Sequence, residues 1–533
     1  MTTNISTTTE QPAESIQNKW DELGLVDFDI LMRKAAQAKP DAIVLKDVNR
    51  QITWSDLDKR INKIANSLIT NNVKPNEHVT ILAKNSITYA EIMFGTQRAG
   101  ARITPLPSLA SAETIVTLLQ DCHSKVLFVA EEYFELIEDL KNADHKPVVI
   151  EFDSETGTYT NIEDFISEAP DTSPEVFSPP EYGFNLIYSS GTTGLPKGIL
   201  HDRAFRAREA SILQEAYEFK QEMRTIISTP FYSNTTLFYF FATIANGGMA
   251  YLMKKFDAEE FLQISEREKI TNVILVPVQY ERVLRVPDFE KYDLSSFKNK
   301  CSTSAPFRAA IKKDLLERWP AGGLYEIYGM TEGGVGTMLA AHEYPDKLDT
   351  VGFPSETTHI KIIDDEGNVL PDGQVGELVG RSHNMMVGYL NRQEATKEAS
   401  WYDEDGLRYH RSGDTGWIDE DGFIHLLDRK KDMIISGGFN IYATDLENTL
   451  LRHENVLDVA VIGAPSEAWG ETPVAFVVPK QPVSFDAEQA REWANSKLGK
   501  VQRISEIRVV GTLPRSAIGK VLKTELRKEF PQL

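Results

Sequence analysis

The chain has 533 residues, of which 41% are hydrophobic and 26% charged, so it can bury sizeable cores and should fold into more than one domain. Its 57 basic and 79 acidic residues give a net charge of −22, which argues against binding nucleic acid or an acidic membrane through a general positive field. Cys122 and Cys301 are too few for a disulfide framework or a thiolate zinc site and are consistent with a reducing compartment.

Residues 1–17 are polar and rich in Thr, and they lack the apolar core of a secretion signal and the arginines of a transit peptide. We therefore expect a flexible tail over residues 1–20. No run of about 18 apolar residues occurs, so we expect no membrane span. The last residues are Phe-Pro-Gln-Leu rather than the Ser-Lys-Leu peroxisomal address, which leaves the cytoplasm as the expected location.

Short apolar runs alternate with amphipathic stretches through the first part of the chain. Runs rich in β-branched residues predict strands, and stretches with helical spacing predict helices. The strands are expected at 79–82, 126–129, 148–150 and 273–276, and the helices at 55–70 and 309–319. This alternation predicts α/β layers with largely parallel sheets.

The pattern of the sequence changes from about Ile360. Segments become shorter, and turn sequences such as 364–368, 371–373 and 419–422 recur, which predicts β-hairpins or a small barrel. After Asp428-Arg429-Lys430-Lys431 follows an α+β segment of about 100 residues, a plausible small domain by size.

Residues 188–198 combine three glycines, four Ser or Thr hydroxyls and one lysine. Glycine lets backbone N–H groups approach an anion closely, while hydroxyls and a lysine add donors for phosphate oxygens. The apolar run 184–188 before this loop predicts a short buried strand. A Walker loop is excluded because only two residues separate Gly191 from Gly194, where such a loop has four, and because Gly198 follows Lys197. A polar linker is the alternative, against which the apolar flanks and the Pro-Lys-Gly ending argue.

Three further segments carry polar groups suited to a nucleotide. Residues 328–332 place an aromatic ring, a glycine, a hydroxyl and a carboxylate together, which could serve one nucleotide or form a tight turn with a solvated Glu. Asp414 could accept hydrogen bonds from a ribose diol and Arg429 could donate to the same sugar, although both are also ordinary turn residues. Lys520 ends the heptad 514–520 near the C-terminus, where a lone lysine is usually solvated.

The order of residues 188–198 resembles the signature loop of the acyl-adenylate-forming superfamily, which includes acyl-CoA ligases, firefly luciferases and the adenylation domains of peptide synthetases. The other three segments resemble later motifs of that superfamily, in the expected order. Ile518 departs from the more usual Ser or Thr, which affects the hydrogen bonding of its loop but not the lysine. The resemblance covers nearly the whole chain.

This resemblance implies an ATP site and the roles of its residues. Lys520, Thr331 and Glu332 would be catalytic, with Glu332 holding Mg²⁺. ATP would contact Ser189, Ser190, Gly191, Thr192, Thr193, Gly194, Lys197, Ser304, Ala305, Pro306, Tyr328, Gly329, Thr331, Asp414, Arg429 and Lys520. A lysine and a metal suit the reaction, because a carboxylate that attacks the α-phosphorus of ATP brings two anions together.

The resemblance also implies the domain organisation. A large multi-layer α/β AMP-binding domain, with a small β-barrel-like part, would span residues 21–430 and hold ATP and the acid. A small mobile α+β lid would span 431–533. Lys431 stands at the hinge position, where it would absorb a change in φ and ψ; the alternative is one cation in a basic cluster.

The acceptor of the acyl group is expected to be coenzyme A. Gly437 and Gly438 could let a pantetheine arm pass close to the backbone or could form a hairpin turn, and Trp469 aligns with an aromatic residue of the pantetheine tunnel in some CoA ligases. Ile435 stands where luciferases carry a second lysine, which disfavours an oxygenase. The segment 229–234 lacks the Asp that pairs with an amino acid, which disfavours an amino acid substrate.

The acid pocket is the least defined part of the prediction. Residues Tyr232, Ser233, Gly329 and Met330 are the candidates for contact with the acid. Among Phe231, Tyr232, Phe238 and Tyr239, at least half are expected to belong to the core rather than to a cavity.

The sequence thus predicts an ATP-dependent carboxylic acid:CoA ligase that uses Mg²⁺ and forms an acyl-adenylate. Transfer to the phosphopantetheine of a separate carrier protein is the alternative, and a nucleotide-binding protein without turnover is a third reading. No nucleic acid partner is expected, and a homodimer is compatible with these observations.

Overall fold

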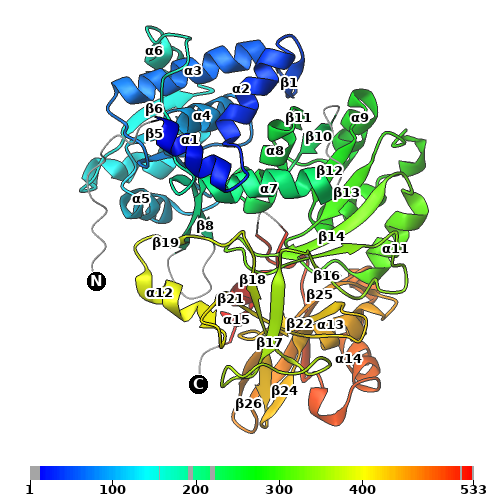
Figure 1. The fold of residues 1–533 in the computed structure, drawn as a ribbon. Helices are drawn as coiled ribbons and strands as arrows, with labels where there is room; N and C mark the ends of the chain where they lie inside the picture. Colours follow the sequence, from blue (N-terminus) through cyan, green and yellow to red (C-terminus); the bar gives the residue numbers. More distant parts are fainter. Residues whose placement is uncertain (1–12, 155, 190–195, 217–222, 517–518, 531–533) are drawn as a thin grey trace. The chain divides into compact units, whose positions relative to one another are not determined.

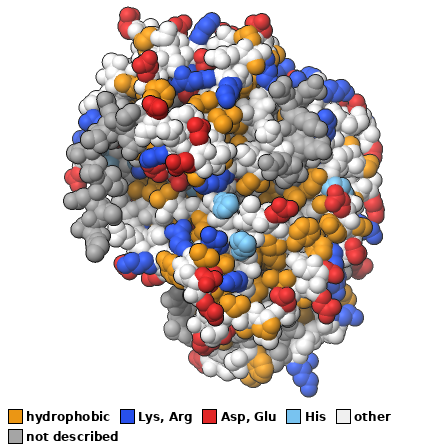
Figure 2. All heavy atoms as spheres, viewed as in Figure 1, with side chains coloured by type: hydrophobic (Ala, Val, Ile, Leu, Met, Phe, Trp, Pro, Cys, Tyr) orange, Lys and Arg blue, Asp and Glu red, His pale blue; other side chains and the backbone are white. Residues whose placement is uncertain are grey.

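The computed structural model describes residues 13–154, 156–189, 196–216, 223–516 and 519–530. The chain divides into two compact units (Figure 1). The first comprises Met1–Leu275, Arg285–Lys300 and His383–Lys397, and the second comprises Val276–Leu284, Cys301–Ser382 and Glu398–Leu533. Acidic and basic side chains are interspersed on the face shown in Figure 2, in keeping with the mixed composition.

The first unit contains an eight-stranded sheet in the order β19-β9-β8-β4-β3-β5-β6-β7. Its strands are β3 (His78–Leu82), β4 (Arg102–Pro105), β5 (Val126–Ala130), β6 (Val148–Phe152), β7 (Thr160–Asn161), β8 (Gly183–Ser189), β9 (Lys197–Asp202) and β19 (Gly388–Tyr389). Pairs from β8 to β7 are parallel, whereas β9 is antiparallel to both β8 and β19. The prediction of largely parallel layers is confirmed here.

A second set of strands in this unit runs β2-β1-β11-β10-β12. The bounds are β1 (Ile43–Lys46), β2 (Gln51–Thr53), β10 (Arg224–Ile227), β11 (Met249–Leu252) and β12 (Asn272–Leu275). The helices of the unit are α1 (Ala13–Glu22), α2 (Phe28–Ala38), α3 (Trp54–Thr70), α4 (Ile87–Arg98), α5 (Ala112–Asp121), α6 (Ile162–Ile166), α7 (Arg203–Ala216), α8 (Asn234–Ala245) and α9 (Ala258–Glu268), with 3₁₀ turns at Glu131–Asn142 and Phe289–Lys291.

Helix α3 shows how the pattern of the sequence produces the structure. Its N-cap Thr53 accepts a hydrogen bond from Asp56 N, and its apolar positions, spaced by three and four, are buried. Helix α4 packs closely against it because residue 95 is glycine: a Cβ there would lie 2.4 Å from Ile64 Cγ2. This pair of helices belongs to the main hydrophobic core of the unit.

The second unit is built largely from antiparallel strands. β14 (Gly323–Gly329), β15 (Gly336–Ala340) and β16 (Phe353–Pro354) form one ladder. A five-stranded sheet follows, with β17 (His359–Ile363), β18 (Gly376–Arg381), β20 (Ser400–Tyr402), β21 (Arg408–Ile418) and β22 (Ile424–Arg429). The turn at 419–422 joins β21 to β22, and its Gly422 has φ +84°. The hairpins expected after Ile360 are therefore confirmed.

The C-terminal part is α+β, as predicted. Its sheet contains β23 (Ile434–Ser436), β24 (Phe439–Ile441), β25 (Val456–Ser466), β26 (Gly470–Pro479) and β27 (Glu506–Val509). The helices of the second unit are α10 (Pro277–Leu284), α11 (Ala309–Arg318), α13 (Ala443–Leu451), α14 (Ala487–Asn495) and α15 (Lys523–Arg527), with 3₁₀ turns at Pro482–Ser484 and Lys500–Gln502. β13 (Asn299–Ser302) and α12 (Gln393–Glu398) have residues in both units.

The expectation of a flexible tail over residues 1–20 is wrong for its described part. Helix α1 begins at Ala13, and its Ile16 and Trp20 side chains are buried against Ala207. The Trp20 indole also donates to Ser178 O at 3.0 Å. The segment is polar overall, so its two apolar residues did not predict a helix. Because they are four positions apart, they lie on one face of α1 and pack that face against the protein. Residues 1–12 lie outside the described part.

Across the described residues, the longest apolar helical stretches fall short of what a bilayer crossing needs.

Candidate functional site

The glycine-rich segment connects two strands rather than a strand and a helix. Ser189 at the end of β8 lies opposite Lys197 at the start of β9 in an antiparallel pair. A Walker loop would lead into a helix, so the topology agrees with its exclusion. Five predicted ATP contacts, Ser190, Gly191, Thr192, Thr193 and Gly194, lie outside the described residues, and the predicted strand before the loop is present and buried.

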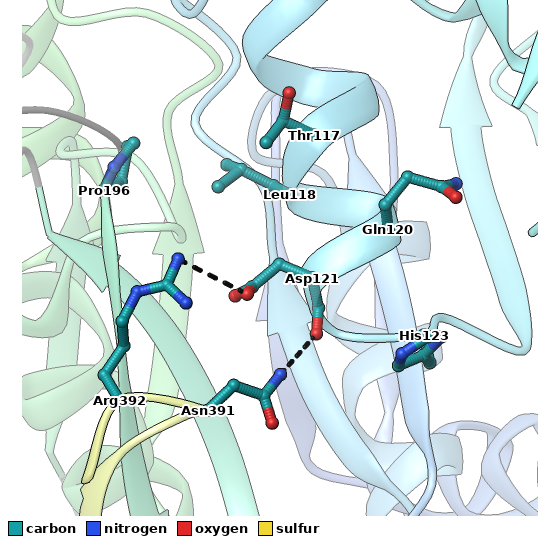
Figure 3. Close-up of a pocket in the computed structure, with 8 residues that line it drawn as sticks. All are labelled: Thr117, Leu118, Gln120, Asp121, His123, Pro196, Asn391 and Arg392. Carbon is teal, nitrogen blue, oxygen red and sulfur yellow. Dashed lines mark hydrogen bonds and ion pairs between the residues drawn. The ribbon is translucent and has the colours of Figure 1, made fainter. Parts of the chain in front are cut away.

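A short segment around β19 lies against the base of this loop. Leu390 N donates to Gly198 O at 2.8 Å, and Lys197 Nζ lies 5.0 Å from the centre of the Tyr389 ring. In Figure 3, Arg392 and Asn391 reach toward Asp121 of α5, with a 3.7 Å ion pair and a 3.0 Å hydrogen bond to the Asp121 carbonyl. The hollow between them has a volume of about 360 Å³ and is lined by Thr117, Leu118, Gln120, Asp121, His123, Pro196, Asn391 and Arg392.

The second unit brings together three of the predicted nucleotide residues. Asp414 on β21 and Arg429 on β22 are direct partners in their ladder, and Arg429 Nε lies 3.0 Å from Asp414 Oδ1. Tyr328 at the end of β14 donates its hydroxyl to Asp414 Oδ2 at 2.7 Å. Burial raises the pKa of the Tyr328 phenol well above its usual value, and the Asp414 charge raises it further. Tyr328 is therefore a neutral donor that orients the Asp414 carboxylate, whose remaining lone pairs can accept from a ligand.

Residues Gly329, Met330, Thr331 and Glu332 follow directly after Tyr328. Gly333 N donates to Met330 O at 3.0 Å, which closes a tight turn, and Gly333 and Gly334 have φ of +71° and +83°. The tight turn, which was one of the two alternatives that the sequence allowed for residues 328–332, is thus present. In this turn Gly329 is exposed, and Thr331 and Glu332 are half-buried. The turn directly follows Tyr328, which with Asp414 and Arg429 forms what we call the Tyr328 cluster, and its partial exposure allows contact with a ligand.

A buried ion pair links β14 to α11, the helix that follows the segment Ser304-Ala305-Pro306. Lys312 of α11 pairs with Glu326, which lies two residues before Tyr328, and Lys312 also donates to Thr350 O at 3.3 Å. Glu326 accepts a hydrogen bond from the backbone of Phe307, and burial raises the Glu326 pKa. Sequence reasoning missed this pair because nothing local marks Lys312 as buried in an otherwise amphipathic helix.

Replacing Lys312 by alanine is expected to lower the free energy of unfolding by roughly 3–5 kcal/mol, because it leaves the Glu326 carboxylate buried and unpaired. Denaturant unfolding measures this loss. The matched control is Lys313→Ala, which removes the neighbouring lysine of the same helix. Its side chain is 72% exposed, so a change within about 0.5 kcal/mol is expected. Equal effects of both substitutions would contradict the structural role of the pair.

Lys520 lies on a closed hairpin near the nucleotide residues. Arg515 and Val521 form an isolated antiparallel bridge, and Ser516 N donates to Lys520 O at 2.8 Å. Lys520 is exposed to solvent, but the protein packed around it still lowers its pKa; the Arg429 charge lowers it further, while Asp414, Asp432 and Glu332 act in the opposite direction. The structure therefore brings Lys520 into the electrostatic neighbourhood of Asp414, Arg429 and Glu332. Ile518 lies outside the described residues.

Gly437 and Gly438 form a hairpin turn between β23 and β24, with φ of +57° and +84°. Gly437 N donates to Trp469 O at 2.8 Å, and a Cβ on Gly437 would lie 2.9 Å from the Trp469 ring. The hairpin alternative is confirmed, and Gly437 also contacts the predicted aromatic residue, whereas a Cβ on Gly438 would face open space. Trp469 is 61% exposed, so its ring presents an apolar face to solvent.

The acid-pocket candidates are divided between the two units. Tyr232 and Ser233 belong to the first, and Gly329 and Met330 to the second. Ser233 is the N-cap of α8, and burial raises the pKa of Tyr232 to about 12. Of the four aromatic residues considered, Phe231 and Tyr239 are fully buried and Tyr232 and Phe238 are half-buried, so the expectation that at least half belong to the core is confirmed.

Lys431 lies in a turn that starts at Arg429. Asp432 N and Met433 N both donate to Arg429 O, at 2.8 and 3.1 Å. Desolvation by the surrounding protein lowers the pKa of Lys431, an exposed residue, to about 8, although Asp432 opposes the shift; the charges of Arg429, Lys520 and Arg527 add to the lowering. The lysine is thus one member of a basic cluster, as the alternative reading held, and it also occupies a defined backbone turn.

Within the described residues, no group of three His, Cys, Asp or Glu side chains is placed to hold a metal. Glu332 offers one hard carboxylate beside the Tyr328 cluster. Mg²⁺ is usually held by one or two carboxylates together with substrate phosphates, so this donor set fits a metal that arrives with ATP.

Comparison with known proteins identifies the family of the chain. The model of the AMP-binding enzyme family matches residues 32–390, and that of the AMP-binding enzyme C-terminal domain matches residues 445–520. A feruloyl-CoA synthase from Amycolatopsis sp is 30% identical over 500 residues, which cover 93% of this chain and 98% of that protein. An indoleacetate–CoA ligase from Aromatoleum aromaticum is 28% identical over 503 residues, covering 92% and 96%.

Among solved structures, the anthranilate CoA ligase AuaEII in complex with anthranoyl-AMP is similar with a TM-score of 0.85 and 25% identity, covering 95% of this chain and 97% of that chain. The family model spans more than half of the sequence, and the curated relatives match over almost their whole length. The chain belongs to the AMP-binding enzyme family.

Proposed function

We propose that this enzyme ligates a carboxylic acid to coenzyme A in two half-reactions. In the first, a carboxylate oxygen attacks the α-phosphorus of ATP; a new O–P bond forms, and pyrophosphate leaves. In the second, the CoA thiol loses its proton and its sulfur attacks the acyl carbonyl; the thioester forms, and AMP leaves. The observation that carries the proposal is the cluster of Tyr328, Asp414 and Arg429, with Lys520 in its electrostatic neighbourhood.

Each of these residues has a chemical part in the proposal. Lys520 would stabilise the negative charge that develops when carboxylate and α-phosphate meet. Asp414, oriented by Tyr328 and Arg429, would accept from the ribose hydroxyls. Thr331 would donate to a phosphate oxygen, and Glu332 would help to hold Mg²⁺, which neutralises phosphate charge.

The remaining ATP contacts belong to the same proposal. Ser304, Ala305 and Pro306 would line the adenine, and Gly329 would lie against the nucleotide. Ser189 and Lys197 would flank a phosphate loop formed by residues 190–194. Lys197 is held above Tyr389 by a cation–π contact, which supports a fixed direction for its ammonium.

Coenzyme A is the proposed acceptor because the similar proteins described above carry CoA ligase or synthase names. The exposed ring of Trp469 against Gly437 supports a pantetheine contact at this turn, with Gly438 beside it. Tyr232, Ser233, Gly329 and Met330 remain the proposed contacts of the acid.

The proposed lid comprises residues 431–533, with Lys431 at its hinge and residues 21–430 as the AMP-binding domain. A cytoplasmic location is part of the proposal. It is supported by Cys122 and Cys301, which are both buried free thiols, as expected in a reducing compartment.

The test is acid-dependent exchange of labelled pyrophosphate into ATP over a panel of acids, followed by AMP release with and without CoA. Exchange together with CoA-stimulated AMP release is the expected result. Exchange without CoA stimulation would favour a carrier-protein acceptor, and no exchange with any acid would favour a nucleotide-binding protein without turnover.

Replacing Trp469 by alanine is expected to raise the KM for CoA about tenfold, the equivalent of roughly 1.4 kcal/mol, and to leave pyrophosphate exchange unchanged. The reason is the loss of one aromatic contact to the pantetheine arm. Steady-state kinetics at varied CoA measures the effect. The control is Tyr402→Ala on β20, because Tyr402 is 60% exposed and thus comparable to Trp469. An unchanged KM in the Trp469 variant would remove this turn from the CoA site.

A further inference from the structure

Asp458 is a shared partner of two arginines from segments far apart in the sequence. Arg308 Nη2 lies 3.0 Å from Asp458 Oδ1, and Arg515 Nη2 lies 2.5 Å from Asp458 Oδ2. Asp458 stands near the start of β25, where the register with β26 shifts between Val456 and Asp458. Such irregularities re-aim a side chain. Here the carboxylate uses both oxygens, one for each arginine.

Arg308 lies next to the proposed adenine contacts in the sequence. Arg308 follows Pro306 by two residues and is the N-cap of α11. Its second partner is Glu281 of α10, at 3.7 Å. The Arg308 guanidinium therefore stands between two carboxylates, and its backbone continues directly into the segment 304–306.

The second arginine spans the hairpin that carries Lys520. Arg515 Nη1 donates to Gly519 O at 2.6 Å, while Arg515 also forms the bridge with Val521. Gly519 fits closely against α10, because a Cβ on it would lie 2.7 Å from Val278 Cγ1. The carbonyl that Arg515 holds is thus the one directly before Lys520, which fixes the direction in which the lysine leaves the hairpin.

Isolated surface ion pairs contribute little to stability. Arg308, Asp458 and Arg515 are 31%, 22% and 25% exposed, and they form a connected chain in which one carboxylate serves two guanidinium groups. Networks of this kind fix geometry more than single pairs do. A contribution to the position of Lys520, rather than to global stability, is what this geometry supports.

We propose that Asp458 and Arg308 are positioning residues for Lys520, and that they join the adenine-lining segment to the lysine that assists adenylation. This inference rests on the proposed function. Binding of the base to segment 304–306 would then fix the position of the Arg308 side chain, and Arg308 would fix the position of Asp458. Asp458 would in turn hold Arg515 and the Gly519 carbonyl in the position that directs Lys520 toward the α-phosphate.

Asp458→Asn tests the proposal with little change in shape, because an asparagine oxygen can still accept the hydrogen bond that Asp458 Oδ1 receives from Val459 N. The expected result is a fall in kcat for pyrophosphate exchange of about tenfold to a hundredfold, as for a small misplacement of a catalytic group. The KM for ATP is expected to change less than kcat, and thioester formation from supplied acyl-AMP is expected to stay within about twofold.

Trypsin cleavage after Arg515 is a second readout that needs no activity. Loss of the Asp458 charge is expected to raise the initial rate of this cleavage several-fold, with an unchanged melting temperature. Arg308→Gln should also lower pyrophosphate exchange, because it breaks the same ion-pair network at its other end. The control is Glu488→Gln on α14, which removes the pair of Glu488 with Arg491 without touching the hairpin.

If Asp458→Asn and Glu488→Gln behave alike in exchange and in cleavage, the proposal is overturned. Parallel losses in exchange and in thioester formation would also overturn it, because they would indicate a general defect. If wild-type protein exchanges pyrophosphate with no acid, the proposed function fails, whereas the cleavage rates still decide whether Asp458 holds the hairpin.

Discussion

Replacement of Lys520 by alanine is expected to slow adenylation by a factor of about 10² to 10³, as for the loss of one preorganised electrostatic donor. Lys520 interacts electrostatically with Arg429, Asp414 and Glu332, and in the proposed function its charge acts where the carboxylate and the α-phosphate meet. Thioester formation from supplied acyl-AMP should fall far less, because the α-phosphate is then already joined to the acyl group. Pyrophosphate exchange and single-turnover thioester formation measure the two steps separately.

The matched control is Lys528→Ala, which removes another C-terminal lysine, one that pairs with Glu525 on the surface. It is expected to leave both steps unchanged. Equal losses in both steps for Lys520→Ala would refute the assignment of the lysine to adenylation and would point to a folding defect, which the melting temperature would reveal.

The fold could be predicted from the sequence where local pattern and tertiary structure agree. The amphipathic spacing in 55–70 predicted α3, and apolar runs predicted β3 and β5, whose side chains are all buried, and β6, of which Val148 is exposed. The pattern failed in α1, where Ile16 and Trp20 are too few to stand out in a polar segment but find a docking site on Ala207.

The site was accessible to sequence reasoning where a motif keeps its residues close together. Tyr328, Thr331 and Glu332 lie within five positions, and a resemblance could carry their roles. Asp414 and Arg429 were expected to share a sugar; what the sequence could not supply is their pairing across β21 and β22, which holds Asp414 between an arginine and a phenol. Their ladder register depends on the whole sheet.

Long-range ion pairs had no signal in the sequence. Arg308 and Asp458 are separated by 150 residues, and each is an ordinary charged residue in its own segment. Lys312 and Glu326 are nearer, but their burial follows from the packing of α11 on β14. Such contacts form only when the helices and strands pack together. A sequence motif can therefore identify the lysine of a loop, but not the distant residues that position it.

Replacing Lys431 by proline is expected to displace Lys520 from the electrostatic neighbourhood of Asp414. Asp432 N and Met433 N both donate to Arg429 O, which is the hydrogen-bond pattern of a helical turn through Lys430 and Lys431. A proline at 431 pushes residue 430 out of the α region. Pyrophosphate exchange should then fall at least tenfold, as for a misplaced catalytic group, while thioester formation from supplied acyl-AMP persists.

Lys431→Ala is the control, since it removes the ammonium but leaves the backbone free to form the turn; both half-reactions should persist in it. The comparison separates the backbone of residue 431 from its charge, which lies in the same cluster as Lys520 and Arg527. If Lys431→Pro retained full pyrophosphate exchange, the turn would not be required for adenylation, and a hinge would have to be sought elsewhere. If both variants lost both half-reactions, Lys431 would instead act through its charge at a site common to the two steps, and the separation of a lid from an AMP-binding domain at this residue would lose its support.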